Sequence, residues 1–437
     1  MESKSRNISK EKTFCAAPWM HLHVINDGRA FPCCVTEIND NNVVGNVKDD
    51  SLLDILNSPK MNAMRKGMLE SKNLPKSCER CTGREASGFS SMRQGMNDQW
   101  YSKVDDLVEN TNNNGSIDEV RLLYWDIRFS NYCNLACRTC HPIFSTSWAN
   151  DYVRLRSHDD NIELGLQNLD NETNFWKELD ENLSKAEEIH FAGGEPVLMP
   201  EHWKIIEFLE KTKRFDVKLK YSTNATKLIV KGKNILDVWE KFTNVHLSLS
   251  IDGTGNHFEL TRHKGNWEKT KQNLIDIGKS NIRYWVHPTV SILNILHITD
   301  LHKELYDLNL IPNKIRDCEL EVDSTTGRIH GYDEQDYFII RFHINPCIHP
   351  DIYSVHNIPE DIKAIATKKI TEYAKECEAK YNIPTSGWDS LVDLMNSQKC
   401  DMKVFNKFVE TTKKLDKIRN QDFCSIQPEF KKYFNLI

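Results

Sequence analysis

The chain is predicted to have an α/β fold with a parallel sheet, open or closed into a barrel. Between residues 120 and 310, short apolar runs such as "VRLLYWDIRFS" and "NVHLSLSIDG" have the composition of strands. Amphipathic stretches such as "EHWKIIEFLEKTKR" and "WEKTKQNLIDIGKS", between such runs, have the spacing of helices. Repeated strand–helix units favour parallel pairing, because each crossover helix returns the chain to the same end of the sheet.

The other elements divide the chain into four segments. Residues 1–95 contain the strand-like runs "MHLHVI" and "RAFPCCV" and a helical stretch, "SLLDILNSPKMNAMRKGML". Residues 96–119 include the polar bridge "ENTNNNGSIDE", whose Asn and Gly content predicts a linker. Residues 120–310 form the core, with further strands predicted in "AEEIHFAGG", "FDVKLKYST" and "RYWVHPTVSI". Residues 311–437 begin with a last strand in "YFIIRFHI" and continue as a mainly helical extension.

Composition narrows the class of protein. The chain has 437 residues, is 39% hydrophobic and has a formal net charge of −6, so it can fill a sizeable core and offers no global attraction to nucleic acid. Its start, "MESKSRNISKEKTF", has no apolar stretch of a secretory signal, and no apolar run is long enough to span a membrane. We therefore expect a cytoplasmic protein that binds neither membrane nor nucleic acid. In a reducing compartment, 13 cysteines favour metal or redox chemistry over disulfides.

A cysteine triplet follows the first core strand. In "NYCNLACRTCHP", Cys133, Cys137 and Cys140 have the spacing C-x3-C-x2-C. A four-iron cluster held by three thiolates leaves one iron open to an outside ligand. The alternatives are a zinc site that borrows a fourth ligand such as His141, or three unrelated thiols in a loop.

Four thiols in the N-terminal segment could close a second site completely. They are Cys15, Cys33, Cys78 and Cys81. Cys34 competes with its neighbour as a ligand, because two adjacent residues of an extended strand point in opposite directions. The spacing from Gly28 favours Cys33. A structural zinc ribbon fits the same four cysteines.

The triplet and the later "GGEP" together resemble the radical S-adenosylmethionine (SAM) enzymes. The resemblance covers residues 120–295 and implies a partial (β/α)6 TIM-like barrel. It also implies a [4Fe-4S] cluster on Cys133, Cys137 and Cys140, whose open iron is chelated by SAM. In that family the reduced cluster cleaves SAM to methionine and a 5′-deoxyadenosyl radical, which abstracts a substrate hydrogen. Thr139 stands where the family commonly has an aromatic residue, so packing on the adenine is expected to differ.

Several residues match positions that contact SAM in similar enzymes. Gly193, Gly194 and Glu195 correspond to the motif whose backbone binds the amino group of the cofactor, a close approach that suits glycine. Four polar residues correspond to positions at the ends of the third and fourth strands that bind ribose and carboxylate, with an Asx or Ser turn as the alternative for each; they are Thr223, Asn224, Ser250 and Asp252. Arg262 matches an arginine that pairs with the SAM carboxylate, with a solvated arginine as the alternative. Val290 and Asn294 would lie near adenine or ribose.

The N-terminal segment resembles the SPASM and twitch domains, which bind auxiliary clusters. Such domains usually follow the barrel, so their position before it here is a departure from the family. The resemblance implies a second, fully ligated [4Fe-4S] cluster, a reductant such as flavodoxin or ferredoxin, and oxidative modification of a peptide or small molecule. An epimerase would instead need a thiol near the substrate. Cys347 is the isolated cysteine expected near the strand ends, with a packed loop thiol as the alternative interpretation. The alternative class is a non-catalytic iron–sulfur or zinc-binding interaction protein.

Overall fold

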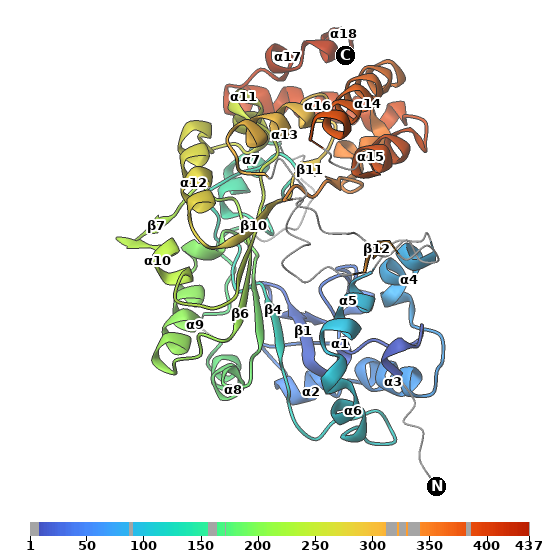
Figure 1. Cartoon of the computed structure of the whole chain (residues 1–437), viewed down its shortest axis with the longest axis vertical. Coiled ribbons are helices and arrows are strands. Elements are labelled where there is room, and N and C mark those ends of the chain that lie inside the picture. Colours follow the sequence, from blue (N-terminus) through green and yellow to red (C-terminus); the bar gives the residue numbers. More distant parts are fainter. Residues whose placement is uncertain are drawn as a thin grey trace.

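The computed structural model describes residues 8–86, 91–155, 164–170, 172–311, 321–322, 329–330, 341–381 and 386–436. Cys318 and the first four residues of the predicted last strand, 337–340, lie outside the described residues. The chain forms a mixed α/β structure with a helical C-terminal part (Figure 1), which confirms the predicted fold class. None of the helices in the described ranges combines the length and apolar character needed to cross a membrane.

The main sheet contains eight strands in the order β10-β9-β6-β5-β4-β1-β2-β3. Neighbours from β1 to β10 pair in parallel, and β2 and β3 continue the sheet in antiparallel pairing. The strands are β1 (His21–Val24), β2 (Arg29–Phe31), β3 (Gly45–Asn46), β4 (Tyr124–Ile127), β5 (Glu188–Phe191), β6 (Lys218–Thr223), β9 (Val245–Leu249) and β10 (Arg283–Val286). The predicted core strands therefore form, and a strand from the N-terminal segment joins their sheet through β4.

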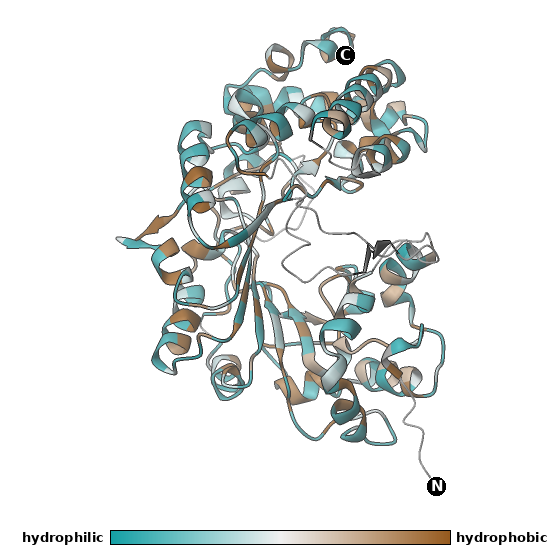
Figure 2. Cartoon of the chain, in the orientation of Figure 1, coloured by the Kyte–Doolittle hydropathy of each residue, from teal (hydrophilic) through white to brown (hydrophobic). Residues whose placement is uncertain are grey.

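The crossover helices cover one face of this sheet (Figure 1). They are α8 (Thr173–Leu183), α9 (Pro200–Lys211), α10 (Ile235–Trp239) and α12 (Trp267–Lys279). Helix α11 (Gly255–Thr261) lies instead beside the C-terminal helices (Figure 1). Hydrophilic and hydrophobic residues both occur along the strands (Figure 2), whose successive side chains point to opposite faces of the sheet. Residues such as Ile189, Phe191 and Leu247 are buried against the helices, as expected for the apolar side of a half-polar strand.

The predicted last strand is described only from residue 341 onward. Phe342 makes a parallel bridge with Val286 of β10, so the chain runs beside the last strand of the sheet at that point. A short parallel pair then joins β11 (Thr289–Val290) to β14 (Asn345–Pro346). Two more short ribbons are β7 (Ile229–Val230) with β8 (Lys233–Asn234) and β12 (Glu321–Val322) with β13 (Ile329–His330).

The C-terminal helices lie together at the end of the molecule that carries the carboxyl ends of the strands (Figure 1). They are α13 (Ile298–Asp307), α14 (Glu360–Tyr381), α15 (Ser386–Asn396), α16 (Met402–Arg419), α17 (Phe423–Ile426) and α18 (Lys431–Phe434). Near the same end, α7 (Ala149–Leu155) follows the cysteine triplet.

The N-terminal segment packs small helices around β1 and β2. They are α1 (Ala17–Met20), α2 (Leu52–Leu56), α3 (Pro59–Leu69), α4 (Glu79–Ala86), α5 (Met92–Gln99) and α6 (Tyr101–Glu109). The single helical stretch expected over 51–69 is wrong in detail, because it divides into α2 and α3. Ser58 caps α3 by accepting a hydrogen bond from the Met61 amide, and Pro59 opens it, a position that proline favours.

Candidate functional site

The cysteine triplet lies in the loop after β4, and the three thiols are close enough to interact electrostatically. The loop folds back onto the end of α11: the Ala136 amide donates to the His263 carbonyl at 3.0 Å, and the Arg138 amide donates to the Thr261 carbonyl at 2.8 Å. The Trp148 indole donates to the Cys137 carbonyl at 2.6 Å. These bonds hold the loop in one conformation at the carboxyl end of the sheet.

The environment of the three thiols suits a bound metal cluster. Burial raises the pKa of Cys133 and of Cys140 to about 12. Burial also raises the pKa of Cys137, while the guanidinium of Arg262, whose Nη1 lies 3.7 Å from Cys137 Sγ, opposes that rise. Thiols with such pKa values stay protonated until a metal replaces the proton. The set therefore has the softness, burial and neighbouring positive charge that a cluster with three cysteine ligands needs.

The Gly193–Gly194 turn follows β5 and packs directly on the start of the cysteine loop. Gly193 has φ +115°, a conformation that a residue with a side chain rarely adopts. A Cβ atom at Gly194 would lie 2.2 Å from the Tyr132 carbonyl oxygen. The Gly194 amide donates to the Ser130 carbonyl at 3.1 Å and the Glu195 amide to the Tyr132 carbonyl at 2.8 Å. Only glycine allows the two backbones to approach this closely.

The Glu195 side chain is buried at the end of β5 and bonded to the end of β6. Thr223 Oγ1 donates to Oε1 at 2.6 Å, and the Asn224 amide donates to Oε2 at 2.8 Å. Burial raises the pKa of Glu195 to about 7, although these hydrogen bonds act in the opposite direction. Asn224 also donates to the side-chain oxygen of Asn134, in the cysteine loop, at 3.1 Å. Glu195, Thr223 and Asn224 therefore form one polar cluster with the loop.

Arg262 and Asp252 form a buried ion pair on the other side of the triplet. Arg262 Nε donates to Asp252 Oδ2 at 2.7 Å, and the second oxygen accepts from the Thr289 amide at 2.8 Å. Asn294 is fully buried and donates to the Asp252 carbonyl at 2.8 Å, so it fastens the loop that contains Val290. Ser250 is half-buried, and its amide donates to the Thr223 carbonyl at 2.8 Å.

The N-terminal cysteines meet in a second place. Cys15, Cys33, Cys78 and Cys81 line one small apolar cavity of about 30 Å³ together with His21. Burial raises the pKa of Cys15 well above its usual value and that of Cys78 to about 12, and neighbouring cysteines add to both shifts. Four thiols that line one cavity offer the number of donors that a fully ligated cluster uses.

Cys34 does not line this cavity. Burial raises its pKa well above the usual value, and the next cause is the carboxylate of Asp126 on β4. The residues 32–35 form a turn after β2 and not the extended strand assumed from the sequence.

In the described part of the chain, no three His, Cys, Asp or Glu side chains are grouped as around a single metal ion.

The C-terminal extension contributes residues that the motifs did not indicate. Arg138, in the middle of the triplet, is fully buried and pairs with Asp416 of α16. Arg419 of the same helix pairs with Asp151 at 2.9 Å and lies over the Trp148 ring. Helix α16 therefore holds the cysteine loop from outside. In the sequence, the one signal of this contact is that the charged Arg138 stands between Cys137 and Cys140. That signal does not identify Asp416 as the partner of Arg138.

A row of polar residues crosses the sheet on the face opposite the crossover helices. In register across the six parallel strands lie His23, Asp126, His190, Lys220, His246 and Arg283. Asp126 Oδ2 lies 3.2 Å from His190 Nδ1, and His190 Nε2 lies 3.0 Å from Ser222 Oγ. Burial alone would raise the pKa of Asp126, but Arg128 and His190 hold it well below its usual range. One polar position recurring in "HLHV", "YWDI" and "EIHF" could have revealed this row.

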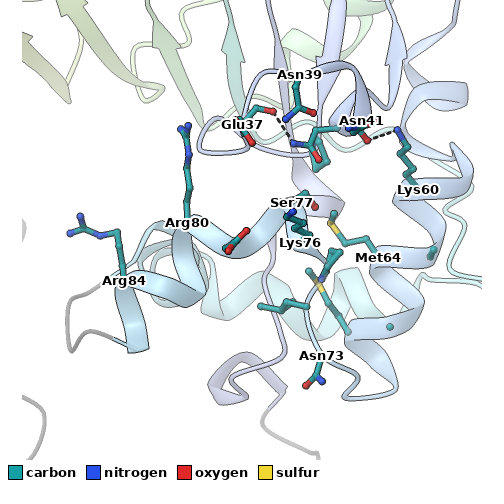
Figure 3. Close-up of a pocket in the computed structure, with 18 of the residues that line it drawn as sticks. Glu37, Asn39, Asn41, Lys60, Met64, Asn73, Lys76, Ser77, Arg80 and Arg84 are labelled. Carbon is teal, nitrogen blue, oxygen red and sulfur yellow. Dashed lines mark hydrogen bonds between the residues drawn. The ribbon is translucent and has the colours of Figure 1, made fainter. Parts of the chain in front are cut away.

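A wide groove of about 1370 Å³ lies next to the N-terminal cysteines. Its walls are the loop 37–42, helix α3, the segment 72–84 and the loop 346–349. Lys60 and Arg80 stand on opposite sides of it (Figure 3). The sequence did not indicate this groove, because its walls come from distant parts of the chain.

Comparison with known proteins identifies two of these regions. Residues 15–82 match the SPASM family, described as an iron-sulfur cluster-binding domain, and residues 127–308 match the radical SAM superfamily. The first match contains the four N-terminal cysteines, and the second contains the triplet, Glu195, Asp252 and Arg262. The comparison with curated proteins finds no match.

Some solved structures resemble the chain weakly. "Native anSMEcpe with bound AdoMet" is 16% identical, with 57% of this chain and 60% of that chain covered and a TM-score of 0.35. SuiB of Streptococcus suis bound to S-adenosylmethionine is 12% identical, with 82% of this chain and 68% of that chain covered and a TM-score of 0.34. The chain thus spans less than two thirds of the length of anSMEcpe.

Proposed function

The chain belongs to the radical SAM superfamily, with a SPASM domain ahead of its radical SAM domain, and on this premise we propose that it abstracts hydrogen from a substrate with a SAM-derived radical. The observation that carries the proposal is the convergence of the three loop thiols with Glu195 and with the Arg262–Asp252 pair. When bound, the reduced [4Fe-4S] cluster supplies the electron that cleaves SAM to methionine and a 5′-deoxyadenosyl radical.

The residues around the triplet have distinct proposed roles. Cys133, Cys137 and Cys140 would hold the cluster, and the backbone of Gly193–Gly194 would accept the amino group of SAM. The guanidinium of Arg262 carries the charge and the planar donors that bind a carboxylate, and Asp252 orients it through Nε. Ser250, Thr223 and Asn224 offer hydroxyl and amide groups for the ribose, with Asn294 and Val290 behind them.

We further propose that the net reaction is an oxidation. The substrate loses a hydrogen atom to the 5′-deoxyadenosyl group, and then one electron and one proton, so that two electrons leave it in total. Cys15, Cys33, Cys78 and Cys81 would hold the cluster that accepts the second electron. An external carrier such as flavodoxin or ferredoxin would supply the first electron.

Between the two candidate substrate classes, the groove favours a peptide over a small molecule. Its volume of about 1370 Å³ exceeds the roughly 300–1,000 Å³ of ordinary small-molecule sites. Its walls also join the N-terminal cysteines to the loop after β14.

The test is formation of 5′-deoxyadenosine. Anaerobically reconstituted protein is incubated with SAM and dithionite, and 5′-deoxyadenosine and methionine are quantified by chromatography. The expected result is production of both by the natural chain and by a Cys400→Ala/Cys424→Ala variant, whose thiols lie outside both sites. Changing all three loop cysteines to alanine should abolish production.

The alternative, a non-catalytic iron–sulfur or zinc-binding protein, predicts another result. It predicts no SAM cleavage, and zinc instead of iron at one or both sites. The match to the radical SAM superfamily and the polar cluster around Glu195 count against it, because a passive metal site needs no such cluster.

A further inference from the structure

We propose that the groove of Figure 3 is a docking site for an acidic peptide segment, and that it recognises the substrate or a part attached to it. The inference rests on the proposed function, because it places this segment beside the two cysteine sites. It names a ligand class that neither family match assigns.

The size and floor of the groove suit an extended chain. At about 1370 Å³ it can hold several residues of a peptide. Its apolar lining includes Met64, Met68 and Leu74 from one side and Ile348, 43% exposed, from the other. Met64 and Met68 are buried, so the exposed Ile348 offers more apolar surface to a ligand than they do.

The lining is also rich in amides. Asn39, Asn41, Asn42 and Asn73 lie along the groove, on the loop 37–42 and after α3. An asparagine side chain offers both a donor and an acceptor, which matches the alternating groups of a peptide backbone. Asn41 and Asn73 are exposed and Asn39 and Asn42 are half-buried, so these amides are open to a ligand in the groove.

The charge of the groove is opposite to that of the whole chain. Two carboxylates, Glu37 and Glu79, face five basic side chains in the lining: Lys60, Lys72, Lys76, Arg80 and Arg84. The chain as a whole has a formal net charge of −6. A local cationic surface on an acidic protein attracts an acidic ligand selectively.

Several of these cations lack a compensating carboxylate. The Lys60 ammonium donates to the carbonyls of Asn41 and Val43 at 2.7 and 2.8 Å, and neither acceptor carries a net charge. Within the described residues, Lys76 and Arg80 have no ion-pair partner. Lys72 differs, because its ammonium lies 2.5 Å from Glu70. An acidic ligand would thus supply counter-charges that the protein itself does not.

The position of the groove connects it with both cysteine sites. Lys76 and Arg80 flank Cys78 in the sequence, so the cationic wall also carries two of the N-terminal thiols. The opposite wall, 346–349, contains Cys347, whose amide donates to the Val290 carbonyl at 2.7 Å. A bound segment would therefore run from the N-terminal cysteines toward the strand ends that carry the proposed SAM contacts.

The experiment measures binding of two fluorescein-labelled dodecapeptides by fluorescence anisotropy to the reconstituted full chain. One contains Glu, Leu and Ser in equal numbers, and the other has Lys in place of Glu. We expect the acidic peptide to bind more tightly, with an affinity that falls as salt rises. Lys76→Glu/Arg80→Glu should weaken binding by at least about tenfold. Lys413→Glu/Lys414→Glu, which makes the same change of charge on the exposed face of α16, should not.

A second variant separates binding from damage to the nearby cysteines. Ile348→Asp introduces a negative charge on the opposite wall, where the side chain is already exposed, and should also weaken acidic-peptide binding. Equal affinity for both peptides, or loss of binding in the α16 control, would overturn the proposal. Formation of 5′-deoxyadenosine from SAM and dithionite is measured in parallel, without peptide. If the natural chain forms none, the proposed function is overturned and not the docking site.

Discussion

Replacing Gly194 with alanine tests whether the turn after β5 must touch the cysteine loop. The added Cβ would lie 2.2 Å from the Tyr132 carbonyl oxygen and 2.6 Å from its carbon. Both atoms belong to the backbone, so no side-chain rotation can relieve the contact. The turn and the loop must separate by about 1 Å to reach an ordinary van der Waals distance.

The cost follows from what that separation breaks. Overpacking of a tight site costs about 1–3 kcal/mol. The bonds from the Gly194 and Glu195 amides, at 3.1 and 2.8 Å, contribute about 1 kcal/mol each. We therefore expect a loss of about 3–5 kcal/mol of local stability. A displacement of this size at a site that must position SAM is expected to slow 5′-deoxyadenosine formation by about 100-fold.

The assay compares 5′-deoxyadenosine formation, SAM affinity and thermal unfolding in Gly194→Ala and Gly95→Ala. Gly95 lies exposed in α5, and no atom would lie within 4 Å of its added Cβ. Gly95→Ala should therefore keep full activity and gain up to about 1 kcal/mol from helix propensity. If Gly194→Ala shows the stability and SAM cleavage of the natural chain, the close approach has no functional importance and the reasoning is refuted.

Three further predictions concern the clusters and the product. Elemental analysis of reconstituted protein should find about eight irons per chain, and about four after all three loop cysteines are changed to alanine; zinc in place of half the iron would contradict the second cluster. Cys34→Ser should preserve the absorption and electron paramagnetic resonance spectra of the N-terminal cluster, whereas Cys33→Ser should remove them, and the reverse pattern would exchange their assignment. With a substrate in hand, mass spectrometry in deuterated water should show loss of hydrogen mass; a one-dalton gain that disappears in Cys347→Ala would indicate an epimerase.

The local features of the fold were predictable from the sequence because they depend on neighbouring residues. Short apolar runs indicated the core strands, and a close backbone approach was expected at Gly193 and Gly194, although to the cofactor and not to the cysteine loop. Helix α3 was missed as a separate element because the helical pattern continues on both sides of Ser58 and Pro59. These two residues are the signals of its start. Attention to that cap would have corrected the boundary.

The remaining features were not predictable, because they depend on contacts between distant residues. Arg138 and Asp416 pair across 278 positions, and no local pattern links them. The pairing of β1 with β4 is equally non-local, since a four-residue strand such as "HLHV" can join any open edge. Parallel partners are separated by long connections, so the sequence near one strand carries little information about the other.

The pairing of β1 with β4 joins the segment that matches the SPASM family to the sheet of the segment that matches the radical SAM superfamily. Because β1 extends the same sheet, the N-terminal cysteines lie beside the polar row of that sheet and not behind its helices. Cys34, next to Cys33, has Asp126 and Arg128 among its electrostatic neighbours. The Cα of Arg128 lies 3.6 Å from where a Cβ of Gly193 would stand. The end of β4 therefore lies near both Cys34 and the glycine turn, although the segments that carry these two features are far apart along the chain.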